Sequence, residues 1–230
     1  MGCQSSGYKW FSGSFEEAKI AAGSKLILLD FYTNFWVGCF RLDAETFSDP
    51  NVISFSDKNF ISLKYNANEE NGSKYFKEYN CQGVPHLIFV DDEGKEMDRI
   101  IGYLPAGEYL ARIKDITQNR NTLSEYLDRY NKEGKNIEII AGIAMKYEDR
   151  GDNEKAAEFY SMLINDNKSS EYYNQSKYFL ASYAFEKGDT NALQEYILSN
   201  PITPFQIDAY MQMAFHFADT QQLEKELAEY

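Results

Sequence analysis

The chain has 230 residues, of which 43% are hydrophobic and 16% aromatic, so the composition excludes wholesale disorder. Its formal net charge of -13, from 36 acidic and 23 basic residues, would repel a phosphate backbone, and no Lys/Arg cluster with interleaved aromatics offsets it. The charge therefore argues against nucleic-acid binding. The longest apolar runs fall well below the ~18 residues that span a bilayer.

The first six residues, MGCQSS, permit three interpretations. They fit the acceptor pattern for N-myristoylation, with Cys3 as a second acylation site. Cys3 also resembles the first mature residue of a bacterial lipoprotein, which suits the rest of the chain better and predicts a protein of the bacterial cell envelope or periplasm. Either interpretation makes Cys3 a candidate lipidation site that anchors the chain to a membrane. The third makes residues 1–13 an ordinary tail.

Cysteine and histidine are sparse in this chain. The cysteines are Cys3, Cys39 and Cys81, and the histidines are His86 and His216. Three cysteines are too few for a disulfide-dense scaffold, and no Cys/His spacing matches a structural zinc site. We therefore expect neither a bound metal nor a cofactor.

The first predicted element is a helix from Ser14 to Ala22. Ser14 and Glu17 have the spacing of a capping box, and Gly23 stops the helix. A strand follows from Leu26 to Tyr32. Its first four residues are continuously apolar rather than alternating, which is typical of a strand that is covered on both faces.

Short strands and helices then alternate up to about residue 116. Further strands are predicted at Phe60 to Asn66, His86 to Val90 and Lys95 to Ile101, the last two being joined as a hairpin by the turn DDEG. Helices are predicted at Cys39 to Phe47, Pro50 to Asp57, Gly72 to Tyr79 and Ala106 to Ile116. The order β-α-β-α-β-β-α calls for an α/β fold with a mixed central sheet and helices on both faces.

Three stretches of this region carry a recognisable pattern. Asp30 lies in the first predicted strand, and FWVGC, Phe35 to Cys39, follows it, with Trp36 as the sixth residue after Asp30. SLKYNAN contains Lys64, and YNCQGVPHL contains Pro85. Together these stretches make residues from about 25 to 116 resemble a thioredoxin-fold domain of the thiol-disulfide oxidoreductase and isomerase type.

The resemblance implies that the chain keeps only the second of two catalytic cysteines. The family motif Trp-Cys-Gly-Pro-Cys aligns with Trp36 at the first, nucleophilic cysteine and with Cys39 at the second, resolving cysteine. Buried under the first helical turn, Cys39 should have a thiol pKa that desolvation raises. Dithiol exchange within the motif is impossible without the first cysteine. Trp36 also adds a large ring where a substrate disulfide would approach.

The resemblance also implies a site around Asp30, Lys64 and Pro85. In the family, the lysine lies beside the buried aspartate. This pair is either a proton relay or a buried ion pair that is retained because removing one partner strands the other. Pro85 is implied as a cis-proline that faces the site. It either shapes a groove for an extended peptide or only forms a tight turn.

Val84 and His86 flank Pro85 and are candidate groove residues. His86 is either a pH-sensitive ligand contact or an edge histidine that is satisfied by hydrogen bonding. Cys81 takes the place of an aliphatic residue of the family, so we expect a small buried hydrophobe there rather than a redox group. Gly102 matches a family glycine after the last strand.

After about residue 119 the chain predicts helices throughout. Thr122 and Glu125 have capping-box spacing, and apolar residues then recur every three or four positions. Ala144 to Asn167 and Leu180 to Pro201 resemble tetratricopeptide repeats, with glycines 37 residues apart against a family period of about 34. These helical hairpins form either a concave partner-binding surface or a cap that stabilises the first domain. Because fewer than three good repeats are visible, the cap is favoured.

The predicted architecture has a tail of residues 1–13, a thioredoxin-like domain of residues 14–118 and an all-α, tetratricopeptide-like region of residues 119–230. Two functions fit it. The first is a thiol-disulfide oxidoreductase or isomerase that acts on protein thiols and is impaired by the missing nucleophile, which leaves enzymatic activity undecided. The second is a non-catalytic, chaperone-like protein that holds extended polypeptide with the proline groove and the helical array.

Overall fold

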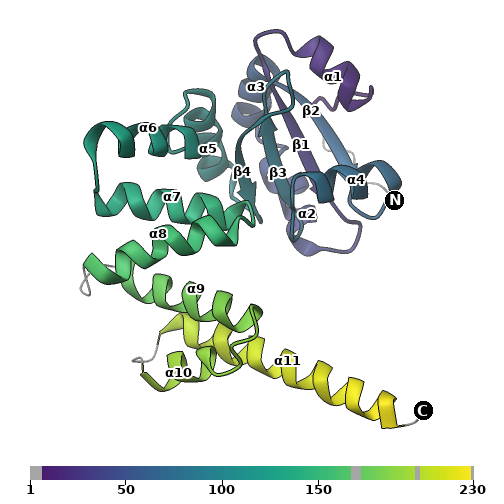
Figure 1. The fold of residues 1–230 in the computed structure, drawn as a ribbon. Helices are drawn as coiled ribbons and strands as arrows, with labels where there is room; N and C mark the ends of the chain where they lie inside the picture. Colours follow the sequence, from purple (N-terminus) through teal and green to yellow (C-terminus); the bar gives the residue numbers. More distant parts are fainter. Residues whose placement is uncertain (1–6, 167–171, 200–202, 229–230) are drawn as a thin grey trace. The chain divides into compact units, whose positions relative to one another are not determined.

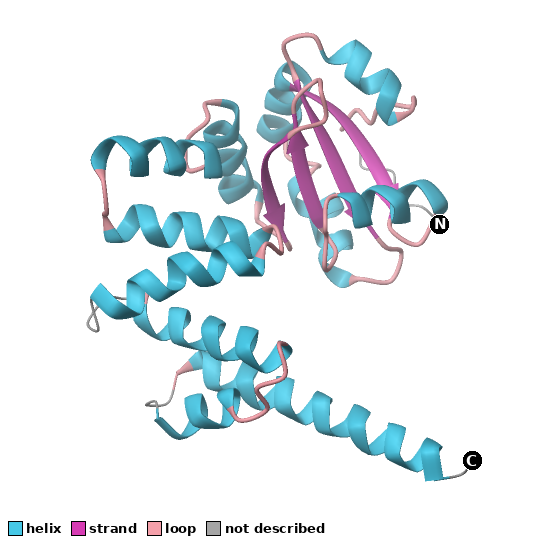
Figure 2. Ribbon diagram, viewed as in Figure 1, coloured by secondary structure: helices cyan, strands magenta, loops and turns pink. Residues whose placement is uncertain are grey.

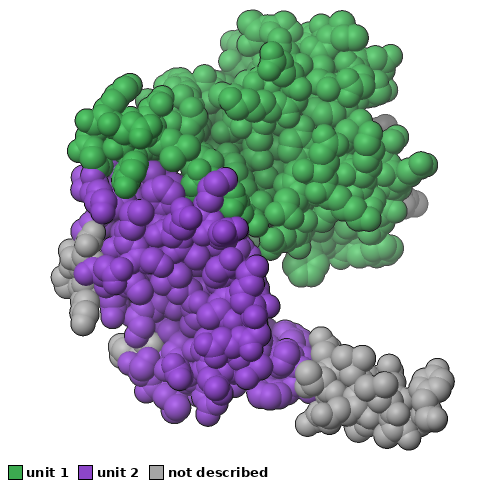
Figure 3. Space-filling view, viewed as in Figure 1, with its two compact units in different colours: residues 1–134, 146–152 green, residues 135–145, 153–230 purple. Residues whose placement is uncertain are grey.

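The computed structural model describes residues 7–166, 172–199 and 203–228 of the chain (Figure 1). The candidate lipidation site Cys3 lies outside the described residues, and so do the last residues of the two repeat-like stretches, Asn167 and Pro201. The chain divides into two compact units (Figure 3). The first comprises residues 1–134 and 146–152, and the second comprises residues 135–145 and 153–230.

A mixed four-stranded sheet of order β2-β1-β3-β4 forms the centre of the first unit (Figure 2). The strands are β1 (Leu26–Tyr32), β2 (Phe60–Asn66), β3 (His86–Val90) and β4 (Glu96–Ile101). β1 runs parallel to β2 and antiparallel to β3, which pairs in antiparallel fashion with β4. The predicted mixed sheet is confirmed, and only β4 differs from its predicted bounds, by one residue.

The helices of the first unit are α1 (Phe15–Ala22), α2 (Val37–Arg41), the π-helical segment η1 (Leu42–Thr46), α3 (Pro50–Asn59), α4 (Glu70–Glu78), α5 (Ala106–Thr117) and α6 (Leu123–Glu133). The helix predicted from Cys39 to Phe47 begins two residues earlier, and its second half is π-helical. The hydrophobic pattern did not distinguish these because a π-helical segment of five residues is too short to change the spacing of apolar residues recognisably.

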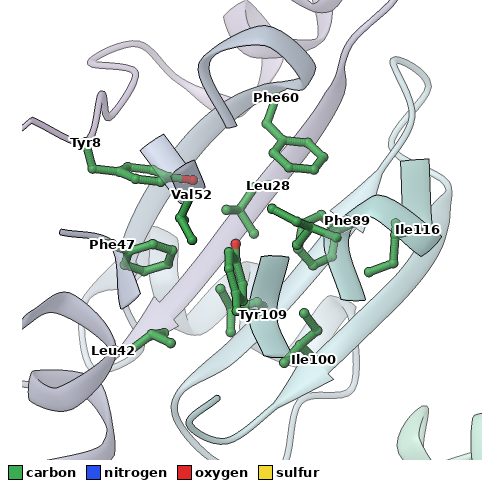
Figure 4. Close-up of a cluster of buried hydrophobic side chains, with 12 residues drawn as sticks. Tyr8, Leu28, Leu42, Phe47, Val52, Phe60, Phe89, Ile100, Tyr109 and Ile116 are labelled. Atoms are coloured by element: carbon green, nitrogen blue, oxygen red, sulfur yellow. The ribbon is translucent and has the colours of Figure 1, made fainter. Parts of the chain in front are cut away.

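Helices cover both faces of the sheet. Leu28 and Phe89 belong to a buried cluster that η1, α3 and α5 cover (Figure 4). Leu29 and Ile88 point to the opposite face, into a cluster with α1 and α4. Because successive strand residues alternate between faces, a strand between two helical layers is apolar at every position. This explains the continuous run at the start of β1.

Two predicted helix caps differ in how they form. At α1, Ser14 accepts from the Glu17 amide and the Glu17 side chain accepts from the Ser14 amide, so the capping box is complete. At α6, the Thr122 hydroxyl accepts from the Glu125 amide, but the Glu125 carboxylate accepts from the amide of Asn121 instead. The second cap therefore also satisfies two amides, but the Glu125 side chain accepts from the residue before the N-cap and not from the N-cap itself.

A network of buried charges ties residues 146–152 to the edge strand β4. Asp98 of β4 is fully buried, and its Oδ2 lies 2.9 Å from the Lys146 ammonium. It also forms an ion pair with Arg112 of α5, and its Oδ1 lies 3.6 Å from Arg150. Removing one charge of such a network leaves the others buried without a partner. The network therefore accounts for the place of residues 146–152 in the first unit.

The second unit contains most of α7 (Ile137–Asp149) together with α8 (Asn153–Asp166), α9 (Tyr173–Glu186), α10 (Ala192–Ser199) and α11 (Pro204–Ala228). α8 packs on α9, where the rings of Tyr160 and Phe179 lie 4.6 Å apart between centroids. α9 also packs on α10 and α11 around Leu193 and Tyr196. Gly188, which follows α9, has a φ of 104° that favours glycine.

Candidate functional site

The motif FWVGC, Phe35 to Cys39, spans the end of the loop between β1 and α2 and the first turn of α2. Trp36 is the N-cap residue, with an extended backbone (φ -94°, ψ 122°), and its carbonyl accepts from the amide of Cys39 at 3.0 Å. No side chain caps this helix, because Trp36 offers no hydrogen-bond acceptor to the first turn. The Trp36 side chain is 56% exposed. The position that the resemblance assigns to the first cysteine is therefore held by an accessible indole.

Gly38 and Pro85 complete the surroundings of Trp36. The Val84–Pro85 peptide bond is cis. A Cβ atom placed on Gly38 would lie 3.2 Å from both the Pro85 Cδ and the Trp36 Cδ1. Only glycine fits without displacing one of these rings. The structure thus brings the motif and the proline loop into contact through Gly38, a residue that sequence reasoning did not single out.

Cys39 is the thiol of this site, and it is buried, with 5% of its surface exposed. Burial raises its pKa above the ordinary thiol value, with Asp30 adding to the rise and a backbone hydrogen bond at Thr33 opposing it. The group is therefore a protonated thiol at neutral pH. Because the thiolate is the attacking species in disulfide exchange, Cys39 is a weak nucleophile in the folded protein.

Asp30 and Lys64 lie opposite each other on β1 and β2. The Lys64 Nζ is 3.6 Å from the Asp30 Oδ2, and it also forms an ion pair with Asp43 of η1. Burial lowers the pKa of Lys64, but the charges of Asp30 and Asp43 outweigh it and leave the pKa raised. Asp43 is a third member that sequence reasoning missed, because its place beside Lys64 depends on how η1 packs on the sheet.

The cost of burying the Asp30 carboxyl is only partly offset by its contact with Lys64. The carboxyl is almost completely buried, and its Oδ1 has no hydrogen-bond partner among the described residues. Burial raises its pKa to about 7, while Lys64 acts in the opposite direction. Asp30 is therefore partly protonated near neutral pH, which is the state that either a proton relay or a strained buried pair would have.

Three aromatic rings surround the Lys64 ammonium. Its Nζ lies 5.0 Å from the ring centroid of Trp10, 4.9 Å from that of Tyr32 and 5.9 Å from that of Phe47. Each ring face attracts the cation. Trp10 comes from the segment before α1, which continues with Phe11, whose amide donates to the Ser62 carbonyl of β2. Residues 8–11 therefore contribute to the site from the sheet edge.

The residues around Pro85 are mostly internal. His86 is buried, its Nε2 lies 3.3 Å from the Arg99 Nη1, and burial together with the Arg99 charge lowers its pKa to about 4. Val84 is partly buried against the α1 and α4 side of the sheet. Cys81 is buried in the same cluster, and burial raises its pKa to about 12. The Gly102 amide donates to the Pro85 carbonyl at 2.9 Å.

Large apolar side chains surround the start of α2. Phe35 is 88% exposed, and Val37 and Phe40 are exposed together with Trp36. We refer to these four residues, Phe35, Trp36, Val37 and Phe40, as the apolar collar. Contiguous exposed apolar residues of this kind mark interaction surfaces on soluble domains. The sequence shows that this stretch is apolar, since every residue of FWVGCF except the glycine is hydrophobic. Residue type alone, however, does not distinguish an exposed apolar surface from a buried core.

Within the described residues, no helix is both long and apolar enough to cross a membrane. Nor do the described His, Cys, Asp and Glu side chains form a group of three or more that is placed to hold a metal ion. The chemistry that the described site offers is therefore that of one buried thiol, a carboxylate and lysine network and an apolar surface.

Comparison with known proteins identifies the domain that carries this site. Residues 14–117 match the family described as a thioredoxin-like domain. The thiol:disulfide interchange protein DsbD of Campylobacter jejuni (strain RM1221) is 35% identical over 108 residues, which are 45% of this chain and 19% of that protein. DsbD of Escherichia coli (strain K12) is 29% identical over 102 residues, which are 43% of this chain and 18% of that protein.

The chain thus spans about a fifth of the length of these curated relatives. Among solved structures, a putative disulphide-isomerase from Bacteroides thetaiotaomicron is 28% identical. The match covers 50% of this chain and 96% of that one, with a TM-score of 0.44.

Proposed function

Because residues 14–117 form a thioredoxin-like domain, we propose that this member binds extended polypeptide at its motif surface and does not perform dithiol exchange. One observation carries the proposal: an exposed Trp36 stands at the position of the attacking thiol, above a buried Cys39. The similarity to thiol:disulfide interchange proteins supports a site of the redox type, and the absence of a thiol at position 36 supports binding in place of dithiol exchange.

Disulfide exchange by this site would have to proceed through Cys39 alone. A dithiol mechanism needs one thiolate to attack the substrate disulfide and a second thiol to release the mixed disulfide. Cys39 is buried and has a raised pKa, so its thiolate is scarce at neutral pH. Access would require the first turn of α2 to open. Monothiol exchange by Cys39 is therefore the weaker alternative. A protein that worked in this way would be an impaired oxidoreductase.

Binding needs only the surface that is already exposed. The four collar residues present two aromatic rings, an indole and an aliphatic side chain beside the loop of Pro85. Aromatic residues contribute most strongly to binding when a partner covers them. A polypeptide with apolar side chains is the partner that such a surface fits, because an acidic protein of net charge -13 offers little attraction to other anions.

The proposal extends to location and to the helical region. The curated relatives are thiol:disulfide interchange proteins of bacteria, which supports a bacterial origin, and the lipoprotein-like position of Cys3 is the basis for proposing a place in the cell envelope or periplasm. Cys3 would anchor the chain as a lipoprotein, and fatty-acid labelling of bacteria that express the natural precursor tests this, since label should enter the wild-type protein and not Cys3→Ser. The positive φ of Gly151 and Gly188 supports helix-turn-helix units like those of tetratricopeptide repeats.

The first test asks whether the purified chain reduces disulfides. With insulin and dithiothreitol, we expect no turnover above the uncatalysed rate, and the variant Cys39→Ser should behave identically. Turnover that disappears in Cys39→Ser would establish the monothiol alternative and refute the absence of redox activity.

The second test measures binding without any redox chemistry. The probe is a reduced and fully alkylated, permanently unfolded polypeptide, which offers apolar side chains and no thiol. The double variant Phe35→Ser/Val37→Ser should weaken its binding at least about tenfold. Ile20→Ser is the matched control, since Ile20 is an 87% exposed apolar residue of α1 outside the collar. Equal binding by the collar variant and the wild-type chain would contradict the proposal.

A further inference from the structure

Helix α11 uses one face to complete the second unit. Phe205, Ala209 and Met213, which follow one another at four-residue intervals, belong to or pack against the buried cluster of Phe185, Leu193 and Tyr196. The side chain of Gln212, next to Met213, accepts from the Ser182 hydroxyl at 2.9 Å. This face of α11 is therefore accounted for by α9 and α10 within the same unit.

The opposite face of α11 is also apolar. Ile207, Met211 and Phe215 are between 51% and 66% exposed on this face, and Tyr210 and Phe217, at 59% and 52%, flank it. At 100° per residue, Ile207 and Met211 lie about 160° to 200° around the helix from Ala209. A soluble surface helix normally has a polar outer face, whereas a helix that is apolar on all sides is buried on all sides. The part of α11 from Pro204 to Ala218 thus carries large apolar residues on the face that its own unit leaves exposed.

We propose that a second copy of this chain covers the outer face, with the two α11 helices packed antiparallel about a two-fold axis at Met211. Ile207, Met211 and Phe215 are equally spaced, so in this arrangement Met211 meets its own counterpart and Ile207 meets Phe215 of the other copy. A two-fold interface requires a surface that complements itself in this way. The proposal is independent of the function proposed for the thioredoxin-like domain.

The charge distribution permits this pairing. The chain has a net charge of -13, which opposes association of two copies elsewhere on the surface. Between Pro204 and Ala218, however, the sequence has one carboxylate, Asp208, and no lysine or arginine. In the antiparallel arrangement Asp208 lies opposite Ala214, three residues from the axis on the other side. No like charges therefore meet at the seam.

The area is sufficient for a weak but specific dimer. The exposed parts of the five side chains Ile207, Tyr210, Met211, Phe215 and Phe217 amount to about 100 Å² each. Two copies would bury about 1,000 Å² with the flanking residues, which is the lower limit for a biological interface. Interfaces of this size give micromolar rather than nanomolar association, because association itself has an entropic cost.

Sedimentation velocity of the full chain, from about 1 to 200 μM, tests the proposal. We expect a monomer–dimer equilibrium, and Phe215→Asp should raise the dissociation constant at least about tenfold. Ile20→Asp is the control, because it puts the same charge on an exposed apolar position of α1. A monomer at every concentration, or a dimer that Phe215→Asp leaves unchanged, would refute the proposal.

Cysteine crosslinking provides a second measurement that depends on the arrangement. In a Cys3→Ser background, Met211→Cys should form a disulfide-linked dimer under mild oxidation, because two copies of this position meet at the axis. Ile207→Cys should not, because its two copies would lie about 12 Å apart along the helix axes, beyond the reach of a disulfide. Efficient crosslinking of Ile207→Cys but not of Met211→Cys would exclude the antiparallel pairing.

Discussion

Replacing Trp36 by cysteine asks whether the missing thiol is all that separates this site from a redox site. The substitution recreates CVGC, with its first thiol at the N-cap of α2 and Cys39 three residues later. Residues three apart on a helix have Cα atoms about 5 Å apart, which lies within the range of roughly 4.4–6.8 Å that a disulfide spans. Asp30, Lys64 and Pro85 would be unchanged. We therefore expect the two cysteines to form a reversible disulfide.

The cost to stability should be small. Trp36 is 56% exposed, so a little under half of its surface is buried. For a side chain of this size that is about 100 Å², worth about 2.5 kcal/mol at ~25 cal/mol per Å², and cysteine recovers part of it. A loss of this size leaves a domain folded unless its stability is already marginal. Urea unfolding of the variant and of the wild-type chain measures the difference.

Free-thiol counting is the decisive assay. The chain has three cysteines, so replacing Cys3 by serine and Trp36 by cysteine keeps the number at three. The denatured variant should show three free thiols after reduction and one after equilibration with oxidised glutathione. The remaining thiol should be that of Cys81, which is buried in the α1 and α4 cluster. Three thiols persisting under oxidising conditions in a folded variant would refute the expectation and indicate a site remodelled for binding.

Two further predictions concern buried carboxylates. Because the fold raises the pKa of Asp30 from 3.8 to about 7, the folded state binds this proton more tightly than the unfolded state does. Asp30 therefore reduces stability progressively as the pH rises from about 4 to about 7, by on the order of 4 kcal/mol in total. Asp30→Asn should be more stable than the wild-type chain at pH 8 and equal to it near pH 4 in urea unfolding, and a gain that is independent of pH would contradict the assigned pKa. Asp98→Ala should cost about 3–5 kcal/mol, because it leaves Lys146 and Arg112 without their carboxylate partner, whereas Arg150 keeps its ion pair with Glu96. Asp57→Ala, which removes an ion pair with the largely exposed Lys9, is its control and should cost less than about 1 kcal/mol; similar losses in both variants would show that the Asp98 network contributes little.

The sequence alone was sufficient for the fold of the first domain, because its signals are local. The apolar run from Leu26, the Ser14 capping box and the DDEG turn each depend on residues within a few positions of one another. Hydrophobic burial and helix capping act on these short patterns wherever the rest of the chain lies. The sequence also shows directly that position 36 is a tryptophan and carries no thiol.

The tertiary structure decided which residues share the site. Asp43 forms an ion pair with Lys64 because η1 packs on the sheet. The ring of Trp10, in the segment before α1, lies against the same ammonium group. Neither lies at a sequence spacing that predicts the contact. The raised pKa of Asp30 likewise follows from burial of its carboxyl, one oxygen of which has no hydrogen-bond partner among the described residues. Both are properties of the packed domain, and the residues next to Asp30 in the sequence do not determine them.

Exposure was also beyond the reach of the sequence. The apolar letters of Phe35 to Phe40 and of Ile207 to Phe215 resemble those of the buried strand at Leu26 to Leu29, and residue type alone does not distinguish them. Only the folded chain leaves most side chains of the first two sets exposed, with Cys39 and Ala209 as buried exceptions, and encloses the third. The physical reason is that hydrophobic burial has no direction, so sequence determines which residues gain from being covered, and packing determines which of them are covered.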